Sequence, residues 1–457
     1  MHCATAVLPR SLDERYLEFL DQTNTVFVQY PQIEPLRYFI FRDLVVEQRA
    51  RSWKDITKDW SRPIRRLPRR TKTLEKADVV LLVEGLREVI VDALLPVYHE
   101  ILSRDIRVQL IGVGGASNLP ESAYYLQSTP HVFPPAWARN SWDALCDTIK
   151  ELRCRSFERS FRSFCANMQG YYDALDTMLD AIDPKVVLNA STQLGGGAGL
   201  IVACRQRGIL TLLLQHGILQ PLYLPIIADY MLTWGQSSTE TLARLEVSSE
   251  KLITLGSPRH DAIGPTSDAN TKSTFYRALS LQEKPTMVFF SNGNDFVRNG
   301  DAPYECARWL EKTAAQYAEE INVIVRLHPN EDGSLYQNCP HLHITKDVPD
   351  LAVTLEGCDW VGSLCSTVLY DALLFKKPVW QFHADHWPEL ANNWRQGLAV
   401  RISSQTELSE SMSQILSVER HGFDERLSSR VFANHGRAAG AVADFIKGRL
   451  EGAKYDS

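Results

Sequence analysis

The sequence lacks the patterns that mark a zinc site, a disulfide framework or a membrane span. Its nine cysteines include no Cys-x-x-Cys pair and no Cys/His cluster with zinc spacing. A membrane-spanning helix needs about 20 apolar residues, but the most apolar stretch, 209–234, is interrupted by glutamines, prolines and an aspartate. We therefore expect a soluble, cytoplasmic protein with reduced thiols and no bound metal.

The charge balance has no strong bias towards either sign. The chain carries 49 Lys and Arg against 55 Asp and Glu, a formal net charge of −6, which argues against a nucleic-acid partner. No Walker A pattern occurs, and the run Gly195–Gly199 lacks the Gly-x-Gly-x-x-Gly arrangement. ATPases and nucleotide-dependent oxidoreductases are therefore disfavoured.

Short apolar runs alternate with helical segments in two successive series. Nearly uncharged runs of this length are typical of parallel strands that helices cover on both faces. The pattern predicts an α/β protein with two facing Rossmann-like domains, a central cleft and an additional N-terminal section. The predicted strands are 78–83, 107–113, 186–189, 210–214, 230–234, 252–255, 286–290, 323–327, 342–345, 359–362, 378–382 and 398–402.

Changes in composition suggest the domain boundaries. Residues 1–75 are expected to form an N-terminal extension with a basic linker, 76–255 the first domain, 256–272 a linker, and 273–457 the second domain with the C-terminal helices. Six basic residues and no acidic residue lie between Arg62 and Lys72. This segment is either a solvated linker or a peripheral contact with anionic lipid or an anionic polymer.

The first candidate site follows the predicted strand 210–214. There Gln215, His216 and Gly217 stand at the carboxyl end of a buried strand, where open α/β sheets bind ligands. A histidine titrates near neutral pH and can act as a base, and Gly217 permits a sharp turn. The alternative is a histidine that only holds its loop by hydrogen bonds.

The second candidate site follows the predicted strand 323–327. Arg326 and His328 share one face of the strand because side chains repeat every second residue, and Pro329 ends the strand. Such a pair suits a phosphate group. The alternative is a structural ion pair of Arg326 beside an ordinary loop histidine.

The third candidate site lies between the predicted strand 359–362 and the helix after it. Ser366 or Thr367 is a suitable N-cap, and the amino end of a helix attracts anions. Asp371, one turn further, could reach ribose hydroxyls. The alternative is a capped helix that binds nothing.

Weaker candidates come from other predicted strand ends. Asn292 and Asn294 follow the first strand of the second domain, where a loop could touch a diphosphate. Glu84 and Asn189 end strands of the first domain and could face an acceptor. Arg259 lies in the interdomain segment Gly256-Ser-Pro-Arg-His-Asp, which is either part of the cleft or a hinge held by local ion pairs.

The motifs around His216, Arg259, His328 and Ser366-Thr367 resemble those of GT-B-fold transferases of bacterial surface polysaccharide synthesis. The resemblance spans roughly residues 186–380. It is closest to the capsule polysaccharide and CDP-glycerol glycerophosphotransferase group, and to sialyl- and Kdo-transferases with an HP motif and a Ser/Thr motif.

The resemblance implies a glycosyltransferase with an acceptor domain followed by a nucleotide-donor domain. The expected donor is a cytidine-type sugar nucleotide such as CMP-Kdo or CMP-sialic acid, with a UDP-sugar as the other option, and the acceptor is a surface glycan or lipid-linked sugar. No cofactor or metal is implied. His216 would be the base, with Glu84 as the other candidate. His328, Ser366 and Thr367 would hold the phosphate, and Asp371 the ribose.

Two other functions remain open from the sequence. A non-hydrolysing UDP-N-acetylhexosamine 2-epimerase shares the fold and a similar His-Gly segment, and needs no acceptor. A GT-B-like subunit without catalytic activity could instead serve an export or assembly complex, and the unmatched residues 1–75 favour that alternative.

Overall fold

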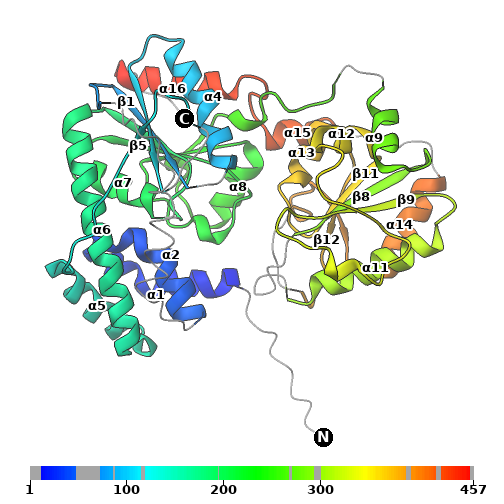
Figure 1. Cartoon of the computed structure of the whole chain (residues 1–457), viewed down its shortest axis with the longest axis horizontal. Coiled ribbons are helices and arrows are strands. Elements are labelled where there is room, and N and C mark those ends of the chain that lie inside the picture. Colours follow the sequence, from blue (N-terminus) through cyan, green and yellow to red (C-terminus); the bar gives the residue numbers. More distant parts are fainter. Residues whose placement is uncertain are drawn as a thin grey trace, which may run out of the picture. The chain divides into compact units, whose positions relative to one another are not determined.

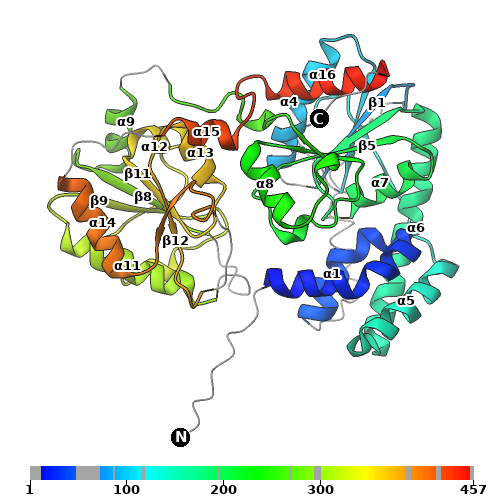
Figure 2. The same cartoon turned by 180° about the vertical axis from the view of Figure 1, so that it is seen from behind.

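The chain forms two compact α/β units in a computed structural model (Figure 1, Figure 2). The seven-stranded unit comprises Arg15–Asp261 and Phe432–Ser457, and the six-stranded unit comprises Met1–Glu14 and Ala262–Val431. The structure describes residues 12–47, 73–85, 88–114, 119–193, 195–266, 270–292, 300–387, 393–417 and 424–452. The basic segment Arg62–Lys72 and Asn294 lie outside these ranges.

All strands of the seven-stranded unit are parallel, in the order β3-β2-β1-β4-β5-β6-β7. Side chains alternate between two cores, as a strand requires. Leu212 and Leu214 belong to the core with α4 and α16, and Leu213 to the core with α7. The strands are β1 (Val79–Glu84), β2 (Val108–Val113), β3 (Tyr124–Tyr125), β4 (Val186–Asn189), β5 (Leu210–Leu214), β6 (Tyr230–Thr233) and β7 (Leu252–Thr254).

Helices cover both faces of this sheet, with α4 and α16 on one side and α6 and α7 on the other (Figure 1). Their bounds are α4 (Glu88–Leu102), α5 (Ala136–Thr148), α6 (Arg155–Ile182), α7 (Gly196–Arg205), α8 (Gln236–Arg244) and α16 (Ala438–Leu450), with short 3-10 turns η4 (Lys150–Leu152), η5 (Pro221–Tyr223), η6 (Ser249–Lys251) and η7 (Pro258–His260).

The N-terminal helices pack against the seven-stranded unit from Arg15 onwards. They are α1 (Leu12–Gln29), η1 (Pro31–Leu36), α2 (Arg37–Phe39) and the π-helix η2 (Ile40–Val46). The Tyr16 hydroxyl donates to the Leu224 carbonyl oxygen at 2.7 Å, and the Tyr172 hydroxyl to that of Gln32 at 3.2 Å. These contacts join the described part of the N-terminal section to the loop after β5 and to α6.

The C-terminal helix belongs to the first Rossmann-like unit, which corrects the boundary expected from the sequence. Ala443, Phe445 and Ile446 of α16 are buried in the core of the seven-stranded sheet. The Asp261 carboxylate accepts the backbone N–H groups of Ala438 and Ala439 at 2.9 and 2.8 Å. The chain therefore returns to its first domain after completing the second.

The six-stranded unit is also fully parallel, in the order β10-β9-β8-β11-β12-β13. Its strands are β8 (Thr286–Phe290), β9 (Asn322–Arg326), β10 (His343–Thr345), β11 (Trp360–Ser363), β12 (Val379–Phe382) and β13 (Val400–Ile402), and its helices are α9 (Thr271–Leu279), α11 (Ala302–Gln316), α12 (Leu351–Gly357), α13 (Val368–Leu374), α14 (Gln405–Ser417) and α15 (Arg426–Val431), with the turn η8 (Ser334–Tyr336). The predicted α/β fold with two Rossmann-like sheets is confirmed.

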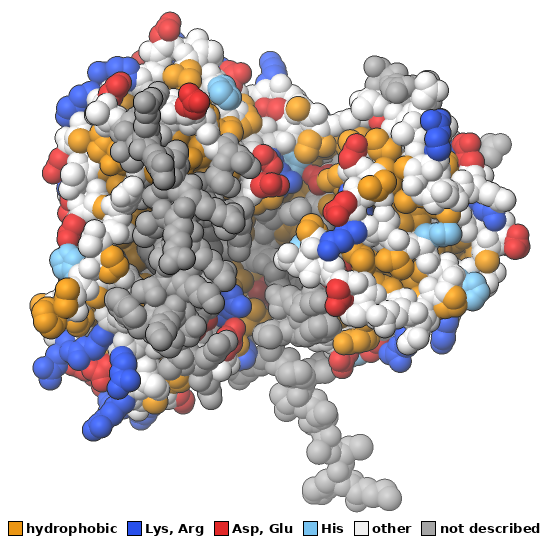
Figure 3. Space-filling model, in the orientation of Figure 1, with side chains coloured by type: hydrophobic (Ala, Val, Ile, Leu, Met, Phe, Trp, Pro, Cys, Tyr) orange, Lys and Arg blue, Asp and Glu red, His pale blue; other side chains and the backbone are white. Residues whose placement is uncertain are grey.

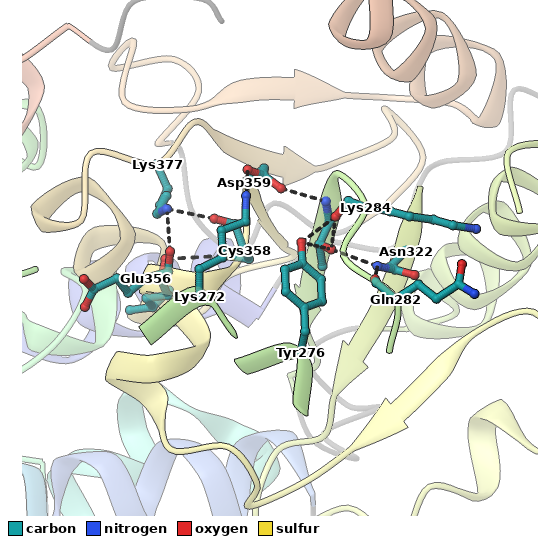
Figure 4. A network of polar contacts seen from close by, with 11 residues as sticks. Lys272, Tyr276, Gln282, Lys284, Asn322, Glu356, Cys358, Asp359 and Lys377 are labelled. Atoms are coloured by element: carbon teal, nitrogen blue, oxygen red, sulfur yellow. Dashed lines mark hydrogen bonds and ion pairs between the residues drawn. The ribbon is translucent and has the colours of Figure 1, made fainter. Parts of the chain in front are cut away.

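A polar network closes the amino edge of this sheet (Figure 4). The Asp359 carboxylate accepts the Thr286 N–H at 2.9 Å, and the Tyr276 hydroxyl lies 3.0 Å from that of Thr286. Lys377 donates to the carbonyl oxygens of Glu356 and Cys358. These hydrogen bonds hold together the segments at the starts of β8 and β11, at the edge opposite the candidate residues.

Among the described residues, no helix is long and apolar enough to cross a bilayer. On the face in Figure 3, the described Lys and Arg side chains are scattered among acidic ones.

Candidate functional site

His328 is the exposed candidate at the carboxyl end of β9. Its backbone N–H donates to the Ser291 hydroxyl oxygen at 2.7 Å and to the Glu331 carboxylate at 2.9 Å. The ring Nδ1 accepts the Asn330 N–H at 3.2 Å. With Nδ1 as acceptor, a neutral imidazole carries its proton on Nε2. The residue therefore presents an N–H donor at the edge of the sheet.

Glu331 and Ser291 were not predicted from the sequence. Glu331 is only 5% exposed, and its carboxylate also accepts the Ser291 hydroxyl. Its own N–H donates to the His328 carbonyl oxygen at 2.9 Å, which closes a turn. The available signal was an acid three residues after the histidine. Together the two side chains hold His328 in place across the ends of β8 and β9.

The Arg326 side chain binds groups at and before α12 and has no hydrogen bond to His328 among the described residues. Its guanidinium donates to the Pro349 carbonyl oxygen and to the Thr354 hydroxyl oxygen, the latter at 2.8 Å. Burial lowers the pKa of this guanidinium. The hydrogen bonds favour a structural role between β9 and α12. The strand ends at Arg326, earlier than expected, so the exposed Pro329 lies in the loop that follows it.

Asn292 organises the loop that leads to Ser366 and Thr367. Its side-chain oxygen accepts the Ser363 hydroxyl at 2.8 Å and the N–H groups of Leu364 and Cys365 at 3.2 and 3.3 Å. Asn292 thus links the end of β8 to the end of β11. It serves the site by shaping this loop.

Ser366 and Thr367 are partly exposed at the start of α13. Thr367 is the N-cap residue, but its side chain makes no capping hydrogen bond. The hydroxyl oxygen of Ser366, just before it, accepts the Val368 N–H at 3.3 Å. Asp371 lies on the same helix but is only 1% exposed. Its burial counts against a contact with a ribose, while the two hydroxyl groups remain at the carboxyl edge beside β8.

The corresponding edge of the seven-stranded sheet carries His216, which is 5% exposed. Its Nδ1 lies 3.4 Å from the Tyr223 hydroxyl. Gln215 links β5 to β6, because its side-chain oxygen accepts the Trp234 N–H at 2.9 Å and its backbone oxygen accepts the Trp234 Nε1–H at 2.7 Å. A Cβ at Gly217 would lie 3.2 Å from the Tyr223 hydroxyl. The segment is thus tightly fitted around His216.

Glu84 binds the amino end of α7. Its carboxylate oxygens accept the N–H groups of Gly196 and Gly197 at 2.7 and 2.8 Å. The Tyr171 hydroxyl donates to the Gly196 carbonyl oxygen at 3.0 Å, and burial raises the pKa of Tyr171 well above its ordinary value. A Cβ at Gly196 would lie 2.6 Å from Glu84. Close packing, rather than ligand contact, therefore accounts for the glycine-rich run.

Asn189 also has an internal hydrogen bond. Its side-chain nitrogen donates to the Ser191 carbonyl oxygen at 2.7 Å, and the residue is 2% exposed. Like Glu84, Asn189 stands at the end of a strand. Its side-chain hydrogen bond is to the backbone of the loop that follows. Both arrangements favour a structural role over contact with an acceptor.

The segment around Arg259 forms a joint within the seven-stranded unit. The Arg259 guanidinium donates to the His216 carbonyl oxygen at 3.5 Å. His260 is fully buried, with Nδ1 2.5 Å from the Ser257 hydroxyl and its ring 4.5 Å from that of Phe432. These contacts favour the second interpretation of this segment, a hinge that local interactions stabilise. Within the segment, Arg259 contacts the backbone of His216.

Two groups of candidates thus emerge, one in each unit. His328, Ser366 and Thr367 lie at the carboxyl edge of the six-stranded sheet, together with Asn292 in the loop after β8. His216 and Arg259 lie at the carboxyl edge of the seven-stranded sheet. Among the described residues, no group of three or more His, Cys, Asp or Glu side chains is arranged to hold a metal ion.

No model of a protein family matches the sequence, and no curated protein sequence matches it. Solved structures do match its fold. S. aureus MnaA with UDP is 14% identical and covers 82% of this chain and 97% of its own, with a TM-score of 0.54. The UDP-GlcNAc 2-epimerase of Methanocaldococcus jannaschii with UDP-GlcNAc and UDP is 13% identical and covers 81% and 99%, with a TM-score of 0.53.

The UDP-GlcNAc 2-epimerase of Neisseria meningitidis bound to UDP-GlcNAc is 14% identical, covers 82% of this chain and all of its own, and has a TM-score of 0.50. At 13–14% sequence identity, similarity to these structures shows that the fold is shared. It confirms the GT-B-like architecture that the sequence motifs implied, and it does not identify a family within that fold.

Proposed function

We propose that this chain is an enzyme acting on a nucleotide-activated sugar, and that it binds the nucleotide through the six-stranded unit. The observation that carries the proposal is the presentation of His328 at the carboxyl end of β9, with Nδ1 occupied and Nε2 as donor. Ser366 and Thr367 add hydroxyl groups at the same edge. Imidazole and hydroxyl donors at this edge suit phosphate oxygens.

Uridine diphosphate is the first nucleotide to test. The three solved structures compared above contain UDP or UDP-GlcNAc, whereas the cytidine donor is proposed from the sequence motifs. A cytidine nucleotide is therefore the second choice.

The leading reaction is epimerisation at C2 of a UDP-N-acetylhexosamine. The epimerases named above align over 99–100% of their own length, so their whole two-domain fold has a counterpart here. Inversion at C2 requires a group that takes a proton from that carbon and a group that returns one. His216 is our candidate base, since Glu84 uses both carboxylate oxygens to bind α7.

Glycosyl transfer is the second candidate. The specific observation in its favour is that the Arg326-Leu-His328-Pro329 and Ser366-Thr367 motifs both lie at one edge of the donor-type sheet, as in the transferases they resemble. In this reaction His216 would take the proton of an acceptor hydroxyl group. The product would then appear only when an acceptor is present.

The test combines binding with turnover on the full-length protein. Calorimetric titrations with UDP, UDP-GlcNAc, CMP and CDP measure nucleotide preference. Incubation with UDP-GlcNAc alone, followed by anion exchange and proton NMR, detects the C2 epimer. We expect UDP and UDP-GlcNAc to bind and the epimer to form. A lack of binding of every nucleotide at millimolar concentration would contradict the proposal.

Two variants separate the roles of the histidines. His328→Ala should weaken UDP binding, while His216→Ala should leave UDP binding intact and abolish turnover. His341→Ala is the matched control, because His341 is an exposed histidine of the same unit that pairs with Glu311. If nucleotide release requires an acceptor, transfer replaces epimerisation. If both variants retain full activity, these residues are not catalytic.

A further inference from the structure

The side chain of Tyr223 packs against His216, the candidate base of the seven-stranded unit. The Tyr223 hydroxyl lies 3.4 Å from His216 Nδ1, and the two rings are tilted by 37° at a centroid distance of 5.5 Å. Both residues are buried. A phenol hydroxyl can accept a hydrogen bond from a ring N–H or donate one to a bare ring nitrogen. The Tyr223 hydroxyl can therefore influence which nitrogen of His216 carries the proton.

The backbone on the His216 side of this contact is held by two side chains. The His216 carbonyl oxygen accepts a hydrogen bond from Arg259 at 3.5 Å, and the Gly217 carbonyl oxygen accepts one from Gln215 at 3.0 Å. A Cβ at Gly217 would lie only 3.2 Å from the Tyr223 hydroxyl. The glycine thus leaves this hydroxyl its place beside the imidazole ring.

The loop that carries Tyr223 is anchored through its backbone carbonyl oxygens. Three of these oxygens accept hydrogen bonds from side chains distant in sequence: that of Leu222 from Gln193 at 3.2 Å, that of Leu224 from Tyr16 at 2.7 Å, and that of Ile226 from Lys251 at 3.0 Å. The anchor from Tyr16 comes from α1, so the N-terminal section helps to hold this loop. Because the carbonyl groups on both sides of Tyr223 are held, its hydroxyl is kept at His216.

We infer that Tyr223 is a positioning residue for His216, with its hydroxyl oxygen accepting the Nδ1–H of the neutral imidazole. The inference rests on the proposed function, in which His216 takes a proton from the substrate. Because Nδ1 faces Tyr223, proton transfer has to use Nε2, whose lone pair exists only when the proton is on Nδ1. At 3.4 Å the bond is long, as catalytic hydrogen bonds often are before a substrate is bound.

The contact has a defined part in the proton transfer. The substrate proton moves to Nε2, and the electron pair of its former bond stays on the substrate. The imidazolium that forms keeps its Nδ1–H bond to the Tyr223 oxygen, so the same contact serves both protonation states. Without the hydroxyl, the neutral ring can place its proton on Nε2, and in that form it is no base at this position.

The tautomer of His216 can be measured without any turnover. Nitrogen NMR of the full-length protein with isotopically labelled histidines distinguishes a proton on Nδ1 from one on Nε2, and the His216 signals are those missing from His216→Ala. We expect neutral His216 to carry its proton on Nδ1, and Tyr223→Phe to shift the population towards Nε2. A wild-type ring protonated on Nε2, or an unchanged tautomer in Tyr223→Phe, would overturn the inference.

Kinetics provide the second readout. Tyr223→Phe should lower kcat for epimer formation about tenfold, the effect of one hydrogen bond. It should leave KM and the affinity for UDP unchanged, because the nucleotide is assigned to the other unit. Tyr98→Phe is the matched control, since Tyr98 is a buried tyrosine of the same unit whose hydroxyl lies 2.9 Å from that of Ser122. An equal fall in kcat in both variants would assign the effect to general destabilisation and overturn the inference. A wild-type protein that binds no nucleotide would contradict the proposed function, while the tautomer measurement decides the part of Tyr223 independently.

Discussion

Replacement of Glu84 provides a direct test of whether this carboxylate is a structural group. In the structure it accepts two buried N–H groups at the amino end of α7, at 2.7 and 2.8 Å. Hydrogen bonds to a charged group contribute about 1.5–3 kcal/mol each. Glu84→Ala should therefore lower the free energy of unfolding by about 3–5 kcal/mol, after allowance for water entering the vacated space.

Glu84→Gln should have about half this effect, because the amide keeps one acceptor but turns a donor towards the second N–H. The assay is urea unfolding followed by circular dichroism. With a slope of about 3 kcal/mol/M, Glu84→Ala should lower the midpoint by about 1–1.7 M. Glu121→Ala, at an exposed position of the same unit, is the matched control and should leave the midpoint unchanged.

The reasoning would be refuted if Glu84→Gln unfolded at the wild-type midpoint and yet abolished turnover. That outcome would mean that the carboxylate acts on the substrate and that its bonds to α7 contribute nothing. A second check is UDP binding, which is assigned to the other unit. It should persist in Glu84→Gln under conditions where the variant is folded.

Three further predictions concern the stability of the seven-stranded unit, each measured by urea unfolding. Gly197→Ala should cost about 2–3 kcal/mol, because the added Cβ would overlap a neighbouring backbone carbonyl; an unchanged midpoint would contradict this packing. Asp261→Ala should cost about 1–3 kcal/mol by leaving two N–H groups of α16 unpaired, and hydrogen exchange of α16 should quicken. The hydrogen bond from Arg107 lowers the pKa of the Asp78 carboxyl, so its contribution is present at neutral pH and is lost as the pH falls through that lowered pKa. The midpoints of wild type and Asp78→Asn should therefore differ at neutral pH and converge in acid, whereas a constant difference would point to another cause.

The sheets could be predicted from the sequence because their strands are short apolar runs bounded by polar residues. Val79–Glu84 and Leu210–Leu214 are buried almost throughout, and such runs are distinctive in parallel sheets. Tyr124–Tyr125 was missed, since two residues without an apolar run give no periodic signal. The partner of α16 was also misjudged: an amphipathic pattern shows that a helix packs, but it does not show against which sheet.

The candidate site was predictable in position but not in role. Residues such as Glu84 and Asn189 do stand at strand ends, as the sequence indicated. Their function depends on which backbone groups face them, and those groups are distant in sequence: Glu84 binds a helix that starts 112 residues later. Glu331 was missed for the same reason, because its carboxylate acts on Ser291 across two strands.

The polar residues at these sheet edges fall into two groups, buried residues that stabilise the structure and exposed residues that could bind a ligand. The side chains of four of them bind backbone groups of nearby helices, loops or strands: Glu84, Asn189, Gln215 and Asn292. His328 differs, because its backbone and Nδ1 are held by neighbours while the residue itself remains exposed. A group that is fixed and exposed is prepared to meet a ligand without paying an ordering cost at binding. On this argument His328→Ala should reduce nucleotide affinity more than a substitution at any of the buried polar positions that leaves the protein folded.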